Sequence, residues 1–351
     1  MGEWRRVRWG DIATLAYGRS LDGYKNRAAT DVRVYGTNGP IGFTDVALAS
    51  GPGIVVGRKG AYRGVHYSPG DFYVIDTAYY LVPSENLDIR WAYYALLTQD
   101  INSLDSGSAI PSTSRESFYS LTVSVPEIGE QRAIASVLGA LDDKIHSNNK
   151  ICRILLDLMD ASCQGLGDNE LTNEVELRDI MLFNYGKALP KTARIVGACP
   201  VVGSGGVDGF HSMSLISAPV VVVGRAGQPG RVHLVLEDCW PIDSAFWVST
   251  LIPLPVAWVW SVLKSLDLAR LQSGSAVPGL NREIAMDERV ILPSTSSLER
   301  IRSNTDPSIQ RLRVLDRETE TLVKIRSLLL PELLSGRLRV RDAEKAVEGV
   351  V

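Results

Sequence analysis

The stretch VVGRKGAYRGVHY at Val55–Tyr67 returns as VVGRAGQPGRVHL at Val222–Leu234, 167 positions later in a chain of 351 residues. The hexapeptide SGSAIP at Ser106–Pro111 returns as SGSAVP at Ser273–Pro278 with the same offset. Shorter blocks around both keep the same order and spacing. A period this long exceeds that of solenoid repeats. The sequence therefore indicates two diverged copies of a whole domain.

Each copy combines strand and helix signals. The runs GIVVG at Gly53–Gly57 and PVVVVG at Pro219–Gly224 are β-branched and stop at glycine, which predicts a buried strand that ends in a tight turn. Apolar residues at helical spacing occur in Ile89–Leu104 and in Ala257–Gln272, each just before the hexapeptide. Each copy is therefore expected to be a mixed α/β domain.

A long helical pattern follows each copy. After the first copy, apolar residues are spaced 4, 3, 4, 3, 4, 3, 4, with an asparagine in the middle, a device that fixes register at some cost in stability. The positions of this heptad seam are Ile134, Leu138, Leu141, Ile145, Asn148, Cys152, Leu155 and Met159. After the second copy the seam is looser, and it consists of Leu312, Leu315, Thr319, Leu322, Ile325 and Leu329. Pro307 is expected to begin the second helix, and Pro331 to interrupt or kink it.

Each seam needs a partner. The two helices can supply each other, and the alternative is that each packs only on its own domain. The residues expected at the helix–helix contact are Ile134, Leu138, Leu141, Ile145, Asn148, Leu155, Leu315, Leu322 and Leu329. A helix of ~35 residues is roughly 50 Å long, and one turn of DNA spans roughly 34–36 Å. An antiparallel pair could therefore hold two domains about one turn of a duplex apart.

The predicted fold class is α+β. Two homologous mixed α/β domains are separated by a pair of long antiparallel coiled-coil helices, with pseudo-two-fold symmetry. The expected parts are a first domain at 1–126, a first long helix at 127–166, a second domain at 167–295, a second long helix at 296–336 and a C-terminal tail at 337–351.

Composition limits the possible partners. The net charge of −3 predicts no overall attraction to nucleic acid. The stretch from Asp22 to Arg63, however, contains six basic and three acidic residues, which is a local basic excess. Four cysteines lie far apart without a C-x-x-C pair, so free thiols in a reducing cytosol are expected, and zinc is not. No secretory signal and no long apolar run is present, which predicts a cytoplasmic protein without a membrane span.

Catalytic motifs are absent from the sequence. It has no Walker A loop, no G-x-G-x-x-G, no G-x-S-x-G and no N-P-P-Y or D-P-P-Y tetrapeptide. His66 and His233 match in the repeat but have no metal-ligand spacing, and Asp76 and Asp243 are expected to cap turns. We therefore predict no catalytic residue and no metal site. The two copies share a framework and differ in their loops, a pattern typical of two recognition domains for different targets.

Two segments carry a resemblance to a known family. EQRAIASVLGALDDKI at Glu130–Ile145 resembles the conserved helix of the specificity (S, HsdS) subunits of type I restriction-modification enzymes. LLLPELLSGRLRV at Leu328–Val340 resembles that family's C-terminal ending. One departure is that the second long helix has Leu298–Ile301, with the sequence LERI, in place of the E-Q-x-x-I start.

The resemblance implies a non-catalytic subunit. Each target-recognition domain would read one half of a bipartite, asymmetric sequence in double-stranded DNA, and the helix pair would set the spacer. Two methyltransferase (M) subunits would dock on the helices and flip adenines for DNA methylation at N6. Restriction (R) subunits would join where they exist. S-adenosylmethionine, ATP and Mg would be held by these partners, and this chain would bind no cofactor.

The residues expected to contact DNA are basic, amide or hydroxyl side chains of the divergent loops. Arginine can pair with guanine and an amide with adenine, while lysine more often holds phosphate. In the first domain they are Lys25, Asn26, Arg27, Thr37, Asn38, Arg58, Lys59, Tyr62 and Arg63. In the second they are Lys187, Lys191, Arg194, Ser204, Arg225, Gln228 and Arg231. Arg58 and Arg225 recur in a G-R frame, which leaves a structural or phosphate-binding role open.

Two other functions remain open from the sequence. One is a non-catalytic coiled-coil adaptor that binds protein partners and no DNA, which the negative net charge favours. The other is a self-contained nuclease or methyltransferase. The hexapeptides are expected to form a shared framework turn and not a reading loop, because readers of different half-sites should differ there.

Overall fold

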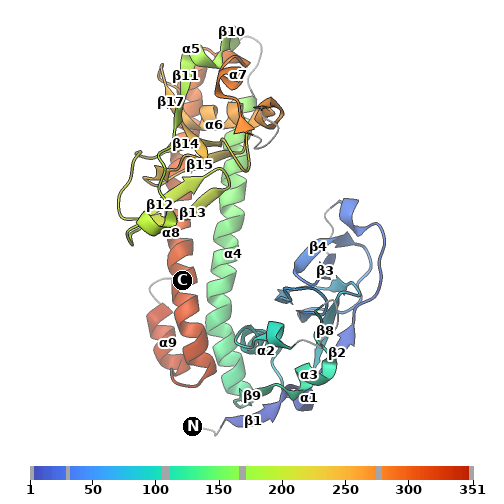
Figure 1. The fold of residues 1–351 in the computed structure, drawn as a ribbon. Helices are drawn as coiled ribbons and strands as arrows, with labels where there is room; N and C mark the ends of the chain where they lie inside the picture. The colour runs from blue at the N-terminus through green and yellow to red at the C-terminus, as the bar shows by residue number, and fades with distance from the viewer. Residues whose placement is uncertain (1–3, 29–31, 105–110, 166–170, 274–278, 348–351) are drawn as a thin grey trace. The chain divides into compact units, whose positions relative to one another are not determined.

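The chain forms two compact units (Figure 1). Unit 1 comprises Met1–His146 and Glu320–Val351, and unit 2 comprises Ser147–Thr319. The computed structural model describes residues 4–28, 32–104, 111–165, 171–273 and 279–347. The hexapeptides therefore lie outside the described residues, except at their ends.

Two long helices contribute to both units. Helix α4 spans Ile128–Gln164 and helix α8 spans Thr295–Leu334. Their first residues lie 167 positions apart, so the internal repeat extends into the helices. The prediction that Pro307 begins the second helix is wrong, because α8 already begins twelve residues earlier, at Thr295. Ser294 precedes this start, and its Oγ accepts a hydrogen bond from the Ser297 amide. The helix also continues through Pro331.

The described residues of unit 1 form three small sheets. The two-stranded sheet pairs β1 (Arg5–Arg8) with β9 (Thr122–Val125) in antiparallel register. The four-stranded antiparallel sheet has the order β2 (Ala13–Tyr17), β8 (Ala78–Pro83), β5 (Gly53–Gly57) and β6 (Val65–Ser68). The three-stranded sheet has the order β4 (Gly39–Thr44), β3 (Val32–Gly36) and β7 (Phe72–Val74), and β3 and β7 are parallel.

Unit 2 repeats this topology. The two-stranded sheet pairs β10 (Leu171–Glu176) with β20 (Arg289–Pro293). The four-stranded sheet has the order β11 (Met181–Tyr185), β17 (Ala245–Thr250), β14 (Val220–Gly224) and β15 (Val232–Val235). The three-stranded sheet has the order β13 (Gly206–His211), β12 (Cys199–Gly203) and β16 (Trp240–Pro241). A further short pair joins β18 (Gln272–Ser273) to β19 (Gly279–Leu280).

Short helices connect the strands. In unit 1 they are α1 (Trp9–Ile12), η1 (Tyr24–Asn26), α2 (Ile89–Leu97), η2 (Ile101–Ser103) and α3 (Arg115–Ser120). In unit 2 they are α5 (Leu177–Ile180), η4 (Lys191–Ala193), α6 (Val256–Ser265), η5 (Leu268–Leu271) and α7 (Arg282–Met286). Helices α2 and α6 confirm the helical pattern predicted before each hexapeptide, although each ends earlier than the pattern does.

The glycine-ended strands are inner strands of the two four-stranded sheets. All five residues of β5 and all five of β14 are buried, as the β-branched runs predict. Gly57 ends β5 where a side chain would not fit, since a Cβ atom there would lie 2.7 Å from the Thr37 carbonyl oxygen. At Gly224, the corresponding distance to the Gln228 carbonyl oxygen is 2.2 Å. The glycines therefore permit the loops that follow to close against neighbouring turns.

The seam residues of the long helices are buried within each unit. In unit 1, Ile134, Leu138 and Leu141 of α4 share a core with Leu322 and Leu329 of α8, and Ile145 packs against it half-buried. In unit 2, Leu315 is fully buried and Leu155 is half-buried. There the Nδ2 of Asn148 lies 3.0 Å from Glu318 Oε2, and Cys152 Sγ lies 3.9 Å from Asp316 Oδ1. These contacts make the two helices antiparallel in unit 2, and the predicted α+β fold with paired long helices is confirmed.

The helices also contact their own domains. In unit 1, the Tyr94 hydroxyl of α2 donates to Asp142 of α4 at 2.7 Å, and Arg90 pairs with Asp143 at 2.6 Å. The two packing modes considered from the sequence therefore occur together. The segment expected to be a C-terminal tail contains helix α9 (Val340–Val347), whose Ala343 is buried in the core of unit 1.

Candidate nucleic-acid interface

Three segments of unit 1 meet at the end of strand β5. The Thr37 hydroxyl, in the β3–β4 turn, contacts the carbonyl oxygens of Lys59 at 2.9 Å and of Thr77 at 2.8 Å. The amides of Arg58 and Lys59 donate to the same Thr77 oxygen at 3.0 and 3.2 Å. The β3–β4 turn, the β5–β6 loop and the β7–β8 turn are therefore joined by hydrogen bonds from the Thr37 hydroxyl and from backbone amides, all of them accepted by backbone carbonyl oxygens.

Unit 2 builds the same junction from different residues. The amides of Arg225 and Ala226 donate to the Ser244 carbonyl oxygen at 2.8 and 3.1 Å. His233 Nε2 lies 2.9 Å from the Ser204 carbonyl oxygen. The framework of this loop cluster is thus retained between the two copies.

The last residue of the first hexapeptide and the residues just after each hexapeptide are part of the junction. In unit 1, the Gly60 amide donates to the Pro111 carbonyl oxygen at 2.9 Å, and the Thr113 amide donates to Arg58 at 2.9 Å. In unit 2, the Leu280 amide donates to the Arg225 carbonyl oxygen at 2.8 Å. These bonds hold the arginine of each G-R frame in place.

Nine residues of the first domain were expected to contact DNA. The junction of unit 1 contains five of them, namely Thr37, Asn38, Arg58, Lys59 and Tyr62. Tyr62 is 67% exposed, so the β5–β6 loop presents an open aromatic ring. Lys25 and Arg27 are exposed on another segment, which begins with η1. Arg27 forms an ion pair with Asp45 at 2.5 Å. Asp45 directly follows β4, whereas Asn38 directly precedes it, so the ion pair lies at the opposite end of this strand. Asn26 belongs to η1, and its side chain lies outside the description.

Arg63 is a correction to the sequence-based list. Its side chain is only 2% exposed. The guanidinium donates to the carbonyl oxygens of Gly60 at 2.9 Å and Asn102 at 2.7 Å. These hydrogen bonds fold the β5–β6 loop onto the domain, so Arg63 stabilises the loop and does not face a ligand.

In unit 2 the junction gathers Arg225, Gln228 and Arg231. Arg231 Nη1 donates to Gln228 Oε1 at 2.5 Å, and both side chains are exposed. Lys187 is also exposed, with its ammonium 5.9 Å from the centre of the Trp240 ring. Lys191 is 75% exposed and lies 3.4 Å from the Asp208 carboxylate.

Arg194 and Ser204 are further corrections. The Arg194 side chain is 11% exposed and is bound to the Asp208 carboxylate at 2.9 Å and to the Asp208 carbonyl oxygen at 2.5 Å. Ser204 is 9% exposed. Neither side chain is free to contact DNA, because one is neutralised within the unit and the other is covered.

Four residues near the junction escaped the sequence reasoning, and they are Tyr17, Arg115, Tyr185 and Arg282. Arg115 and Arg282 occupy the first position of α3 and α7, each after a residue whose side chain caps the helix, Ser114 or Asn281. The signal was present in the sequence, since the dipeptide Arg-Glu follows both hexapeptides with the same spacing, 167 residues apart.

The paired histidines lie beneath the junction. Burial lowers the pKa of His66, although a hydrogen bond with the Thr37 backbone opposes that shift. The imidazole lies 3.4 Å from the site a Cβ would take at Gly39, in the β3–β4 turn, and His233 lies similarly near Gly206. In the part of the chain that the structure describes, no group of three or more His, Cys, Asp and Glu side chains could hold a metal ion. No described helix combines the length and hydropathy needed to cross a membrane.

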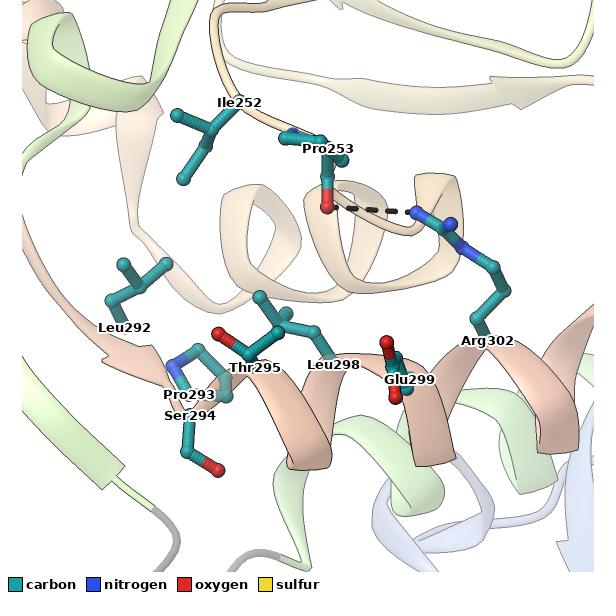
Figure 2. Close-up of a pocket in the computed structure, with 9 residues that line it drawn as sticks. All are labelled: Ile252, Pro253, Leu292, Pro293, Ser294, Thr295, Leu298, Glu299 and Arg302. Carbon is teal, nitrogen blue, oxygen red and sulfur yellow. Dashed lines mark hydrogen bonds between the residues drawn. The ribbon is translucent and has the colours of Figure 1, made fainter.

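A cavity of about 420 Å³ lies at the start of α8 in unit 2 (Figure 2). Its lining includes Ile252, Pro253, Leu298 and Arg302, and Arg302 donates to the Pro253 carbonyl oxygen at 3.5 Å. Leu298 is the repeat counterpart of Gln131 in unit 1.

Gln131 occupies the matching place in unit 1. Its Nε2 donates to the carbonyl oxygens of Pro126 at 3.0 Å and Asn86 at 3.2 Å, and its Oε1 accepts from the Asp88 amide at 2.9 Å. Leucine cannot make these bonds, so the departure from the E-Q-x-x-I start coincides with a more open helix start in unit 2.

Comparisons with known proteins relate the first part of the chain to one family. The model of the type I restriction modification DNA specificity domain matches residues 1–154, which include the loop junction of unit 1 and the first part of α4. The type I restriction enzyme EcoprrI specificity subunit of Escherichia coli is 26% identical over 157 residues. Residues 1–154 of this chain are thus similar to the DNA specificity domain of type I restriction-modification enzymes. The E. coli alignment covers 43% of this chain and 39% of that protein.

Two further comparisons reach into the second half of the chain. The type I restriction enzyme MjaIX specificity subunit of Methanocaldococcus jannaschii is 20% identical over 310 residues, which cover 75% of this chain and 72% of that protein. The crystal structure of a type I restriction-modification S subunit from M. genitalium matches with a TM-score of 0.68 and 20% identity, over 94% of this chain and 96% of that one. At this identity the structural likeness establishes the shared fold. Both curated relatives are specificity subunits by name.

Proposed function

We propose that this chain is the DNA-specificity subunit of a type I restriction-modification enzyme and binds a bipartite, asymmetric target in double-stranded DNA. Residues 1–126 and 167–295 would each recognise one half-site. The observation that carries the proposal is the loop junction, which occurs in both units with the same backbone hydrogen bonds but different exposed side chains. A shared scaffold with altered loops suits two related domains that read different bases.

The exposed side chains of the junction are suited to base recognition. Asn38 and Gln228 carry amides that match adenine, and Arg231 carries a guanidinium that matches guanine. Lys59 lies 3.8 Å from the Asp76 carboxylate, and both side chains are about half exposed. Lysine at this position suits phosphate binding better than base reading.

The long helices would set the gap between half-sites and dock two methyltransferase subunits, with restriction subunits joining where the system has them. S-adenosylmethionine, ATP and Mg would be bound by those partners, where adenine methylation and DNA cleavage occur. The two helices share a buried seam in each unit and are antiparallel in unit 2, which supports a stiff spacer because a buried seam resists bending of either helix.

Mapping of methylated adenines with the gene present and deleted tests the recognition role directly. A split motif that disappears on deletion is expected, and an unchanged methylation pattern would contradict the proposal. Seven residues inserted after Ser147 in α4 and after Thr319 in α8, where the two helices face each other, test the spacer. The tolerated gap should lengthen by about three base pairs, since seven residues add ~10 Å of helix. Changed half-site bases would contradict the spacer role.

The net charge of −3 favours a protein adaptor as the second candidate. Binding to a random duplex separates the two functions. A DNA-binding chain should bind at low salt and lose affinity steeply as salt rises, whereas an adaptor should show no binding under either condition.

A further inference from the structure

In unit 1 two arginines lie close to one exposed tyrosine ring. The Cζ atom of Arg58 lies 4.9 Å from the centre of the Tyr17 ring, and that of Arg115 lies 4.7 Å from the same ring. Tyr17 is 45% exposed, and it packs against the buried Tyr79 with ring centres 5.1 Å apart. Residues from β2, the β5–β6 loop and α3 thus form one cluster at the surface.

Unit 2 repeats the cluster. Tyr185 is 56% exposed, and the Cζ atoms of Arg225 and Arg282 lie 5.3 and 5.8 Å from its ring centre. The two arginines follow their counterparts by 167 positions, and the tyrosine follows by 168. We call each cluster an arginine–tyrosine triad, meaning Arg58, Tyr17 and Arg115 in unit 1 and Arg225, Tyr185 and Arg282 in unit 2.

Backbone carbonyls orient Arg58 and Arg225 without neutralising them. Arg58 Nη1 donates to the Asp76 carbonyl oxygen at 3.1 Å, and Arg225 Nη1 donates to that of Asp243 at 2.8 Å. Among the described residues, no carboxylate forms an ion pair within 4 Å of Arg58, Arg115 or Arg225. Arg282 has one carboxylate neighbour, the exposed Glu283 at 3.6 Å. A guanidinium stacked on an aromatic face keeps N–H donors at its edge, which suits an anion.

A comparison of the residues at matching positions of the two copies indicates which anion the triads would bind. Loop positions around the triads differ, since Lys59 corresponds to Ala226 and Tyr62 to Pro229. The triads do not differ. Base-reading residues should change between domains that read different half-sites, whereas phosphates are the same at every half-site.

We propose that each triad binds a phosphate of the DNA backbone and so positions its domain for base reading by the neighbouring loop. This inference rests on the proposed function. It assigns Arg58, Arg115, Arg225 and Arg282 to phosphate binding that does not depend on base sequence.

The test measures how salt weakens DNA binding by the full chain. Arg115→Gln, Arg282→Gln and the double variant are titrated with a random duplex and with the mapped target, between 50 and 200 mM salt. Each lost phosphate contact should reduce the salt slope by about 1, so each single variant should lose about three- to fourfold less affinity over this range than the parent. The reduction should be equal on both duplexes.

Two control variants separate the loss of a phosphate contact from a general loss of positive charge. Arg289→Gln removes the same charge from an exposed arginine that is paired with Glu174 and Glu176, and it should leave the slope unchanged. Arg115→Lys should restore most of the slope, because lysine retains a point charge that can hold phosphate.

Three outcomes would overturn the proposal. If the chain binds DNA but the triad variants show the same salt slope as Arg289→Gln, the triads have a structural role only. A methylation motif altered at one base would make them base readers. A parent chain that binds no duplex at low salt would remove the proposed function itself, and the triad proposal with it.

Discussion

Asn148 Nδ2 donates a hydrogen bond to Glu318 Oε2 at 3.0 Å, and the asparagine is only 1% exposed. The Thr319 hydroxyl oxygen lies 3.4 Å from the same nitrogen. A polar group this well covered is stable only where its partner is in register. The contact therefore ties one position of α4 to one turn of α8 in unit 2.

Asn148→Asp should destabilise unit 2 by about 1–3 kcal/mol at neutral pH, because the new carboxylate would be buried beside Glu318. The loss should shrink in mild acid, as one of the two carboxyls takes up a proton. Urea denaturation at pH 7 and pH 5 measures both effects. Asn149→Asp is the matched control, since Asn149 is exposed. An equal loss in both variants would show that the buried hydrogen bond contributes nothing specific.

The sequence predicted the seam of α4 because heptad spacing within one helix reports which side is covered. It could not predict that Asn148 faces Glu318, because spacing within one helix does not fix the register of another. The start of α8 was placed wrongly for a similar reason. Pro307 suits a first turn, but Ser294 and the repeat offset place the first residue at Thr295.

The candidate site was predicted in part. The repeat located the junction around Arg58 and Arg225, because local turn chemistry is visible in the sequence. It could not separate the exposed Tyr62 from the buried Arg63, since both belong to one polar loop and only the long-range contact with Asn102 distinguishes them. The stacking of Arg115 on Tyr17 joins residues 98 positions apart, which no local pattern reports.

Gln131→Leu should destabilise unit 1 by about 1–3 kcal/mol. The variant copies the leucine found in unit 2 but leaves the Asp88 amide and the carbonyl oxygens of Asn86 and Pro126 without their bonds. The reciprocal change, Leu298→Gln, should alter stability by less than about 1 kcal/mol, because Leu298 lines an open cavity. Guanidinium denaturation of both variants measures the difference. Equal losses would contradict the asymmetry between the two helix starts.

Only two of the four cysteines should react with a thiol reagent in the folded chain. All four are free thiols. Burial raises the pKa of Cys163 and of Cys239 to about 12, so their reactive thiolate forms are scarce at pH 7.5. Cys152 and Cys199 are partly exposed, and burial raises their pKa as well, so they should react slowly. Thiol titration should count four reactive cysteines in denaturant and two in the folded chain. The double variant Cys152→Ser, Cys199→Ser should abolish the reaction of the folded chain. Fast labelling of Cys239 would contradict this packing.

Asp160 should give unit 2 an acid-sensitive contribution to stability. Burial raises the pKa of Asp160, but hydrogen bonds from Lys264, at 2.7 Å, and from Ser261 outweigh burial and hold the pKa below its usual value. A carboxyl whose pKa is lower in the folded state stabilises that state above the unfolded pKa, about 3.9. The contribution is lost as pH falls through the folded pKa.

Asp160→Asn should therefore lower the urea midpoint at pH 7, and its difference from the parent should decrease between pH 4 and pH 2. Asp157→Asn serves as the control, because Asp157 is exposed on the same helix and should shift the midpoint little at any pH. A parent–variant difference for Asp160→Asn that stays constant on acidification would mean that the aspartate acts through packing and not through its charge.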